Sequence, residues 1–256
     1  MFILFFIFHW YLALFFQTFF HHRYASHRAF KMSKFWERVF FVFAYIAQGS
    51  SYMSPRAYAV MHRMHHAYTD TDKDPHSPLF FKNVFSMMRH TRKIYQQIFF
   101  KTVEPEKRFV KDIPDWPWFD RWTVTKTSKV VWSLFYIAIY VIFAPSYWYF
   151  LLLPIEIFMV PFHGAIVNWF AHKYGYRNFE MKNTSTNLLP VDVLLMGEAY
   201  HNDHHKHASA INFGVKWYEF DLTYYIILGL GKLGIIKLNS RNEAAEIEQQ
   251  AAMNEA

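Results

Sequence analysis

Long apolar runs alternate with polar, charged segments along this chain of 256 residues. The first run, residues 1–20, is interrupted only by His9, Gln17 and Thr18. Twenty helical residues rise about 30 Å, which matches the hydrocarbon thickness of a bilayer. We therefore expect a membrane-spanning helix at 1–20. A cleaved signal peptide is the alternative, but the run has neither a basic leading segment nor a small-residue cleavage site.

Two later stretches complete the predicted membrane part. Residues 39–53 begin as an apolar run but soon pass into Gln48, Gly49 and two serines. Such a run is too short to cross a bilayer, so we expect an interfacial or re-entrant helix. Residues 130–167 hold two apolar runs joined at Pro145-Ser146 without a charge, which predicts a transmembrane hairpin. About three spans are therefore expected.

The remaining organisation is simple. Residues 239–256 are rich in Ala, Glu and Gln and are expected to form a solvated polar tail. No repeat or linker divides the chain, so residues 1–256 are expected to form a single domain. Composition agrees with a lipid setting, since 53% of residues are hydrophobic, 21% aromatic and only 18% charged.

Charge indicates the orientation and the partners. Arg23, Arg28, Lys31 and Lys34 follow the first run, which by the positive-inside rule places that end in the cytoplasm. The formal charge is +7, and residues 82–129 hold eleven Lys or Arg against five Asp or Glu. No nucleic-acid module is recognisable. The expected partners are therefore the membrane surface and an acidic substrate or protein, and not nucleic acid.

Histidines gather in clusters with helical spacing. The intervals i, i+3 and i+4 occur twice, and in a helix they put three rings on one face. The predicted topology brings all the clusters, and the pair Asn168 and His172, to the same cytoplasmic face. The clustered histidines are His22 and His27, then His62, His65 and His66, and then His201, His204 and His205.

These rings predict a site for two metal ions. With no Cys in the chain, imidazole must carry any borderline metal chemistry, and imidazole suits iron, zinc, copper or nickel. Nine histidines exceed the six positions of one octahedral ion. The His-Glu-x-x-His arrangement of zinc peptidases is absent. Two redox-active irons beside lipid instead favour oxygen-dependent oxidation of a C–H bond.

The chain resembles membrane fatty-acid desaturases of the acyl-CoA, stearoyl-CoA-like class, in the bacterial type without a fused cytochrome domain. The motifs that carry the resemblance are His22-Arg23-Tyr24-Ala25-Ser26-His27-Arg28, His62-Arg63-Met64-His65-His66 with Asp74-Pro75-His76, Asn168 with His172, and Gly197-Glu198 leading to His201-Asn202-Asp203-His204-His205.

The resemblance implies an all-α integral membrane protein. A transmembrane helical stem of about three spans, with interfacial helices, would lie under a cytosolic helical cap that encloses a diiron site. Family members usually have a further apolar span before the first histidine pair, which this sequence lacks, and Ala199 stands where the family often has Gly. The implied iron ligands are His22, His27, His62, His65, His66, His172, His201, His204 and His205, with Asn168 acting through a water.

The activity implied is the introduction of a cis double bond into a saturated acyl chain, delta-9-like, on acyl-CoA or a lipid. It would use O₂ and two electrons from a separate donor such as ferredoxin or a b-type cytochrome. A diiron fatty-acid or alkane hydroxylase is the alternative enzyme, and a His-rich membrane metal carrier is the alternative of another class.

Further residues are candidates for supporting roles. We expect Asp70, Asp74, Glu198 and Asp203 to orient ligand imidazoles through hydrogen bonds, and His76 to orient its loop. Phe6 and Trp10, on the first span, are candidates for the distal end of an acyl tunnel. The other histidines fit no metal-binding spacing and are assigned to structure or surface: His9, His21, His90, His163 and His207.

Overall fold

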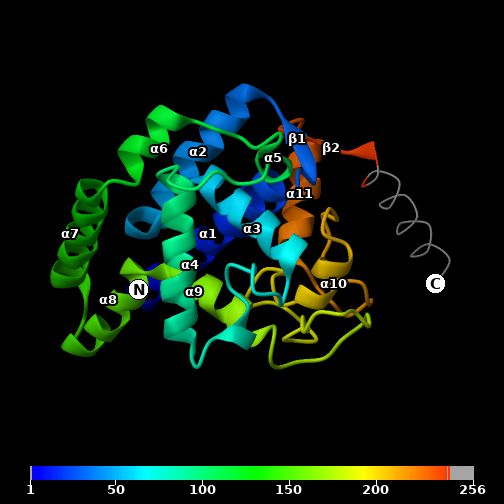
Figure 1. The fold of residues 1–256 in the computed structure, drawn as a ribbon. Helices are drawn as coiled ribbons and strands as arrows, with labels where there is room; N and C mark the ends of the chain where they lie inside the picture. The colour runs from blue at the N-terminus through cyan, green and yellow to red at the C-terminus, as the bar shows by residue number, and fades with distance from the viewer. Residues whose placement is uncertain (1, 241, 243–256) are drawn as a thin grey trace.

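The chain folds into a helical stem and a helical cap, seen side by side in Figure 1. This computed structural model describes residues 2–240 and 242. Met1 and most of the predicted polar tail at 239–256 lie outside the described residues. The stem holds α7, α8, α9 and the start of α1, and the cap holds α3, α10 and α11 (Figure 1). The predicted all-α fold is confirmed.

The element bounds, in chain order, are α1 (Phe2–Phe16), η1 (Gln17–Ser26), β1 (Phe30–Met32), α2 (Lys34–Gln48), η2 (Gly49–Ser51), α3 (Pro55–Tyr68), η3 (Pro78–Phe80), α4 (Val84–Phe99), α5 (Lys107–Val110), α6 (Pro117–Thr123), α7 (Lys126–Phe143), η4 (Tyr147–Leu152), α8 (Leu153–Ile157), α9 (Met159–Ala165), η5 (Ile166–Phe170), α10 (His201–Lys206), α11 (Leu222–Lys232) and β2 (Ile236–Leu238).

The first helix is longer than its apolar run. Helices α1 and η1 form one rod over Phe2–Ser26, long and apolar enough to cross a membrane, whereas the sequence predicts its end at residue 20. In η1 the bonds run from i to i+5, as in His27 N to His22 O at 3.2 Å, and such π segments are frequent at functional sites. The membrane-crossing helix therefore carries His22 itself.

The prediction that Arg23 is a solvated charge at this helix end is wrong. The positive-inside argument places it at the membrane surface, but its side chain is 0% exposed and pairs with Asp221. Lys31 and Lys34 are exposed as expected. The rule counts charges along the sequence and cannot distinguish a solvated cation from one that a buried carboxylate neutralises.

The region of the predicted hairpin, 130–167, holds a straight helix followed by a bent pair of helices. Helix α7 is a single rod, while η4 with α8 meets α9 with η5 at a bend of 72°. Pro161 explains the break, because it has no N–H for the Ile157 carbonyl and its ring crowds that oxygen. Ser50 Oγ donates to the Ile157 oxygen at 2.7 Å, which replaces the missing bond. Two helices, or three if the bent pair is one span, could cross a membrane.

The segment predicted to be interfacial or re-entrant supplies that serine. Helix α2 ends at Gln48, earlier than the predicted limit of residue 53, and η2 follows it. Ser51 Oγ accepts from Val160 N at 3.3 Å, so both serines serve the broken helix. Backbone groups inside a membrane need protein partners because lipid offers none.

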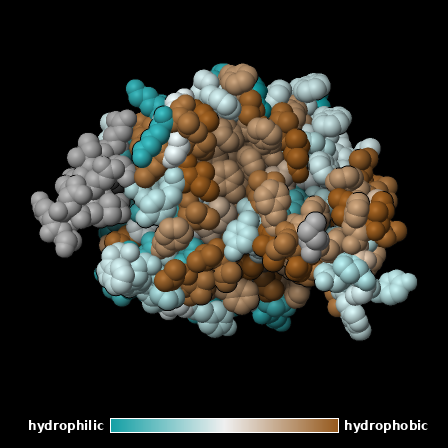
Figure 2. Space-filling view, turned by 180° about the vertical axis from the view of Figure 1, so that it is seen from behind, coloured by the Kyte–Doolittle hydropathy of each residue, from teal (hydrophilic) through white to brown (hydrophobic). Residues whose placement is uncertain are grey.

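Apolar surface marks the lipid-facing side of the stem. On α7, side chains such as Leu134, Val141 and Ile142 are more than half exposed. Hydrophobic residues also cover much of the face turned away from the viewer in Figure 1 (Figure 2). Exposed apolar area on this scale indicates contact with lipid.

An aromatic core joins the stem to the cap. Buried rings from η1, α2 and α6 pack together, including Phe19, Phe20, Phe41 and Phe119. Strands β1 and β2 pair antiparallel, with Phe30 opposite Leu238, and close the cap beside α11. The core holds the end of the first helix against α11, which fixes the segments that carry the clustered histidines.

Candidate metal centre

Helices place most of the predicted ligands. On α3, Pro55 occupies the first turn and the Ser54 side chain accepts from Ala57 N, two features that favour a helix start. This helix carries His62, His65 and His66. Helix α10 begins at His201 and carries the second triplet, while His172 follows η5 closely in the chain.

All nine predicted histidines come together, in two groups. One group holds five rings and the other holds four, and within each group one nitrogen per ring lies within 4.8 Å of the others. The first group is His22, His27, His62, His66 and His204, and the second is His65, His172, His201 and His205.

Each triplet is divided between the groups. His62 and His66 join the five-histidine group, whereas His65 joins the four-histidine group. In α10 the division is reversed, since His201 and His205 lie in the four-histidine group and His204 in the other. Residues i+3 and i+4 are about 100° apart around a helix, so one face can serve two neighbouring centres.

The ring nitrogens of each group converge at hydrogen-bond distances. His22 Nε2 lies 2.9 Å from His204 Nε2, and His204 Nε2 lies 2.9 Å from His66 Nε2. In the four-histidine group, His65 Nε2 lies 3.1 Å from His205 Nε2. Carboxylates accept from Nδ1 of His22 and His65, so the Nε2 atoms of these two rings carry lone pairs. Several imidazole nitrogens that converge on one point suit a metal ion between them.

Burial keeps these rings neutral. Burial, and then repulsion from neighbouring imidazoles, lowers the pKa of His62, His66 and His204 well below the ordinary value. The same causes lower the pKa of His201 and His205. Neutral imidazole is the form that binds metals, so the site is ready for ions without first losing protons.

Three of the candidate supporting carboxylates contact rings of the two groups, directly or through a hydroxyl. Glu198 accepts from His22 Nδ1 at 2.8 Å, and Asp74 accepts from His65 Nδ1 at 2.9 Å. Asp70 acts through a hydroxyl, since Thr184 Oγ1 donates to it at 2.8 Å and lies 3.2 Å from His172 Nδ1. Such contacts fix the tautomer and direction of a ligand ring.

The pKa values of Asp74 and Asp70 are shifted in opposite directions. Burial raises the pKa of Asp74. Burial also acts to raise the pKa of Asp70, but the nearby His172 ring and the hydrogen bonds from Ser77 and Thr184 outweigh it, and the pKa is lowered. Asp70 is therefore held as the anion that supports the Thr184 contact.

Asp203 does not follow the prediction. Its Oδ2 accepts from Asn178 Nδ2 at 2.9 Å and from Asn187 Nδ2 at 2.8 Å, so it ties α10 to the loop before it. In a helix it lies between the ligand positions, and its side chain leaves the face that His201 and His204 share.

The predicted roles of His76 and Asn168 are not tested by their contacts. The His76 ring is buried and lies 4.3 Å from the His65 ring, centre to centre, and within the described part of the chain neither of its nitrogens has a hydrogen-bond partner. Asn168 is half-buried on η5, four residues before His172. The water-mediated role of Asn168 stays a prediction.

Sequence reasoning missed several supporting residues. Asp192, 0% exposed, accepts from the backbone N–H groups of Leu195, Gly197 and Ala199, and so shapes the loop that enters α10. Thr184 was also missed. The available signal was a lone Asp between Pro190-Val191 and Val193-Leu194, since an acid in an apolar run is usually bound by partners.

The protein also has an apolar groove of about 480 Å³, and none of the nine histidines lines it. Trp10 lines it, whereas Phe6, the other predicted tunnel residue, does not. Two lining residues, Phe170 and Tyr174, flank His172 in the chain. The rest of the lining is aliphatic, from Ile166, Leu188, Leu189, Leu194 and Leu195.

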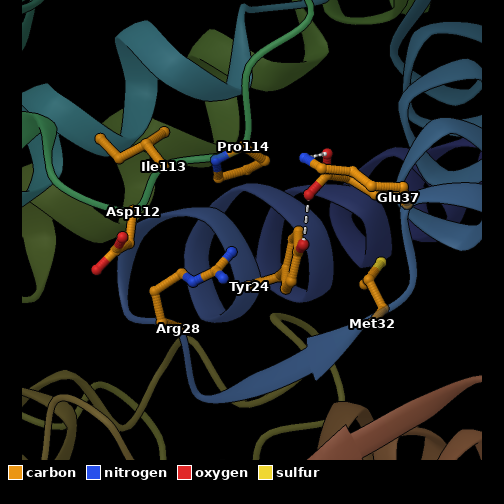
Figure 3. Close-up of a pocket in the computed structure, with 8 residues that line it drawn as sticks. Tyr24, Arg28, Met32, Glu37, Asp112, Ile113 and Pro114 are labelled. Carbon is orange, nitrogen blue, oxygen red and sulfur yellow. Dashed lines mark hydrogen bonds and ion pairs between the residues drawn. The ribbon is translucent and has the colours of Figure 1, made fainter.

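A second cavity, of about 220 Å³, has a polar lining (Figure 3). Tyr24 donates to Glu37 Oε2 at 2.6 Å inside it, and Arg28 and Asp112 line the opposite side (Figure 3). Its lining mixes both signs of charge, and it includes none of the predicted ligands.

Comparison with known proteins agrees with this centre. Residues 1–234 match the family described as fatty acid desaturase. The Delta-9 desaturase-like 2 protein of Arabidopsis thaliana is 32% identical over 228 residues, which cover 85% of this chain and 70% of that protein. The sn-1 stearoyl-lipid 9-desaturase of Synechocystis is 32% identical over 220 residues, covering 84% and 64%. The palmitoyl-monogalactosyldiacylglycerol delta-7 desaturase of Arabidopsis thaliana is 29% identical over 219 residues, covering 84% and 55%.

The match covers both histidine triplets, the first histidine pair and His172. It also covers the spanning helices that bring them to one end of the stem. The family match extends over most of the chain, and the two histidine groups lie within it. This chain therefore belongs to the fatty acid desaturase family.

Proposed function

We propose that this protein is a membrane-bound desaturase that introduces a cis double bond into a saturated fatty acyl chain, with O₂ and two electrons, at a pair of irons. The observation that carries the proposal is the convergence of nine imidazoles in two groups, as where His22 Nε2 lies 2.9 Å from His204 Nε2. Family membership makes it an oxidoreductase that acts on fatty acyl groups.

The donor set favours iron in both positions. The proposed ligands are the nine histidines, with Asn168 at the four-histidine group through a water. Imidazole without thiolate or a bridging carboxylate suits a redox-active borderline metal. Two irons held there would supply the oxygen-dependent removal of hydrogen from unactivated methylene groups.

The chain's own residues hold and shield this chemistry. Glu198 and Asp74 accept from Nδ1 of His22 and His65 and so direct each Nε2 inward. Phe213 packs its ring 4.3 Å from the His204 ring and keeps water from that side. The groove beside Trp10 offers an apolar path for an acyl chain next to the segment of His172.

The proposed substrate is a long saturated acyl chain on CoA or on a membrane lipid, oxidised at a delta-9-like position. Several relatives are named for delta-9 desaturation and three for lipid-linked substrates, which supports this choice. We further propose that the site faces the cytoplasm, since Lys31 and Lys34 follow the first span. Electrons would come from a separate carrier, such as ferredoxin or a b-type cytochrome.

Expression in a host and gas chromatography with mass spectrometry of its fatty acids test the proposal. A new cis-monounsaturated species, found in the lipid or the acyl-CoA fraction, is expected, and His204→Ala should abolish it. His90→Ala is the matched control, because His90 belongs to neither group. A hydroxylated product would indicate the hydroxylase instead.

Metal content tests the same proposal independently. Two irons per chain, with O₂ uptake that needs acyl substrate and reductant, are expected. A single exchangeable zinc without O₂ uptake would indicate a metal carrier and contradict the desaturase.

A further inference from the structure

A buried ion pair lies directly beside the five-histidine group. Arg23 Nη2 lies 2.6 Å from Asp221 Oδ2, and both side chains are 0% exposed. Asp221 also accepts from Phe213 N at 2.9 Å and Tyr224 N at 3.2 Å. The attraction between two buried charges often fails to offset their loss of hydration, so such a pair needs a reason beyond stability.

A continuous line of hydrogen bonds leads from this pair to His22. Arg23 Nη1 donates to Thr18 Oγ1 at 2.6 Å, and the Thr18 hydroxyl donates to Glu198 Oε1. The same Glu198 oxygen accepts from His22 Nδ1 at 2.8 Å. Because Arg23 only donates, it occupies a Thr18 lone pair and leaves the single hydroxyl hydrogen for Glu198. The direction of every bond in the line is thereby fixed.

A second line of contacts runs through an aromatic ring. The Arg23 guanidinium lies 3.8 Å from the centre of the Phe213 ring. That ring in turn lies 4.3 Å from the His204 ring and 5.3 Å from the His22 ring. One guanidinium therefore supports two rings of the five-histidine group from two sides.

The backbone before Glu198 is fitted to the same carboxylate. Gly197 has φ +96°, and a Cβ built on it would lie 2.4 Å from Asp221 Oδ1. Only a residue without a side chain allows this approach. Asp221 thus sets the position of the Glu198 backbone as well as that of Arg23.

We propose that Thr18, Arg23 and Asp221 are positioning residues for the five-histidine site, which fix Glu198 and, through it, the tautomer and direction of the His22 ring. The inference rests on the proposed function, since it takes that group to hold iron. The four-histidine group uses other supports, Asp74 at His65 and Thr184 at His172. Disturbing Thr18 should therefore weaken one iron and spare the other.

The test compares Thr18→Val, which keeps the shape and removes the hydroxyl, with Thr18→Ser, which keeps the hydroxyl. Iron affinity is measured by chelator competition and the iron environments by Mössbauer spectroscopy. Thr18→Val is expected to weaken one of two irons about 10- to 100-fold and to change one of two Mössbauer components. Thr18→Ser should restore both properties.

Thr123→Val is the matched control. Thr123 is as buried as Thr18, but its hydroxyl donates at 2.8 Å to Phe119 O within α6 and reaches no predicted ligand. A general cost of losing a buried threonine hydroxyl would appear in both valine variants. Weaker binding of one iron is expected in Thr18→Val and not in Thr123→Val.

The outcomes separate this inference from the proposed function. Thr18→Val with two irons at wild-type affinity and with a wild-type spectrum would overturn the inference and leave the desaturase proposal standing. A wild-type protein that binds no iron would overturn both. If Thr18→Val does not fold, Asp221→Asn tests the same line: weakening of one iron supports the inference, and unchanged binding overturns it.

Discussion

The His9 imidazole and the Glu156 carboxylate meet inside the stem, with Nδ1 2.6 Å from Oε1. His9 Nε2 lies 2.7 Å from the Ala47 carbonyl oxygen, which only accepts, so Nε2 carries a hydrogen. One imidazole therefore ties α1 to α2 and to α8. Polar groups at membrane depth persist where protein partners satisfy them, and this pair holds α8 against the first span.

Glu156→Leu should destabilise the stem, because His9 Nδ1 would be left buried without a partner. The expected loss is about 1–3 kcal/mol, and Glu156→Gln, whose amide can still donate to Nδ1, should lose less. Thermal unfolding in detergent, followed by tryptophan fluorescence, measures both. In the double variant His9→Leu/Glu156→Leu the losses should not add. Equal losses for Leu and Gln would show that the hydrogen bond is unimportant.

Gly197→Ala should disrupt the site, and Gly229→Ala should not. A Cβ at Gly197 meets the Asp221 carboxylate and needs a positive φ, whereas nothing lies within 4 Å of a Cβ at Gly229 in α11. The second change should even stabilise that helix, by up to about 1 kcal/mol. Unfolding midpoints and iron content check both variants. A Gly197→Ala protein with two irons and wild-type stability would contradict the close packing seen here.

Asp120 should make stability fall as pH rises. Burial raises the pKa of Asp120 from 3.8 to about 6, although hydroxyls of Ser54 and Tyr52 donate to it. Between these values the unfolded chain has lost the proton and the folded chain keeps it. The contribution of this carboxyl is therefore fully present below pH 3.8 and is lost as pH rises through about 6.

Asp120→Asn removes this titrating group. Comparing the variant with the wild type therefore separates the pH effect of Asp120 from that of the histidines. The wild type should lose about 2–3 kcal/mol relative to the variant between pH 4 and 7, on the order of two pKa units. Unfolding midpoints measured over this range test the difference. If the unfolding midpoints of the two proteins changed with pH in the same way, the raised pKa of Asp120 would be contradicted.

Trp10→Ala should lengthen the acyl chain that the enzyme accepts, since Trp10 lines the apolar groove proposed as the path of that chain. Product distributions from host lipids measure the effect. Trp118→Ala is the matched control, because Trp118 is 71% exposed on α6 and does not line the groove. Unchanged chain-length preference in Trp10→Ala would exclude a role for Trp10 in the tunnel.

Much of the fold follows from local pattern. The apolar run at 1–20 predicts a spanning helix because length and hydropathy suffice for that inference. The histidine triplets predict a shared helical face for the same local reason. Pro161 predicts the helix break at Phe158. The Ile157 carbonyl freed by the break accepts from Ser50, which lies more than a hundred residues away in sequence, so local pattern does not predict that bond.

The sequence by itself determined the type of ligand, the number of imidazoles and their helical spacing, since these depend on residue identity and on a period of about 3.6. Only the tertiary structure decided that His204 joins His22 while His201 joins His172, and that Arg23 is buried against Asp221 rather than solvated. Asp203 and Glu198 have the same charge and both lie near α10, yet only Glu198 reaches a ring. The reason is physical: a partner for a buried polar group is chosen by contacts between distant segments, and local spacing does not record them.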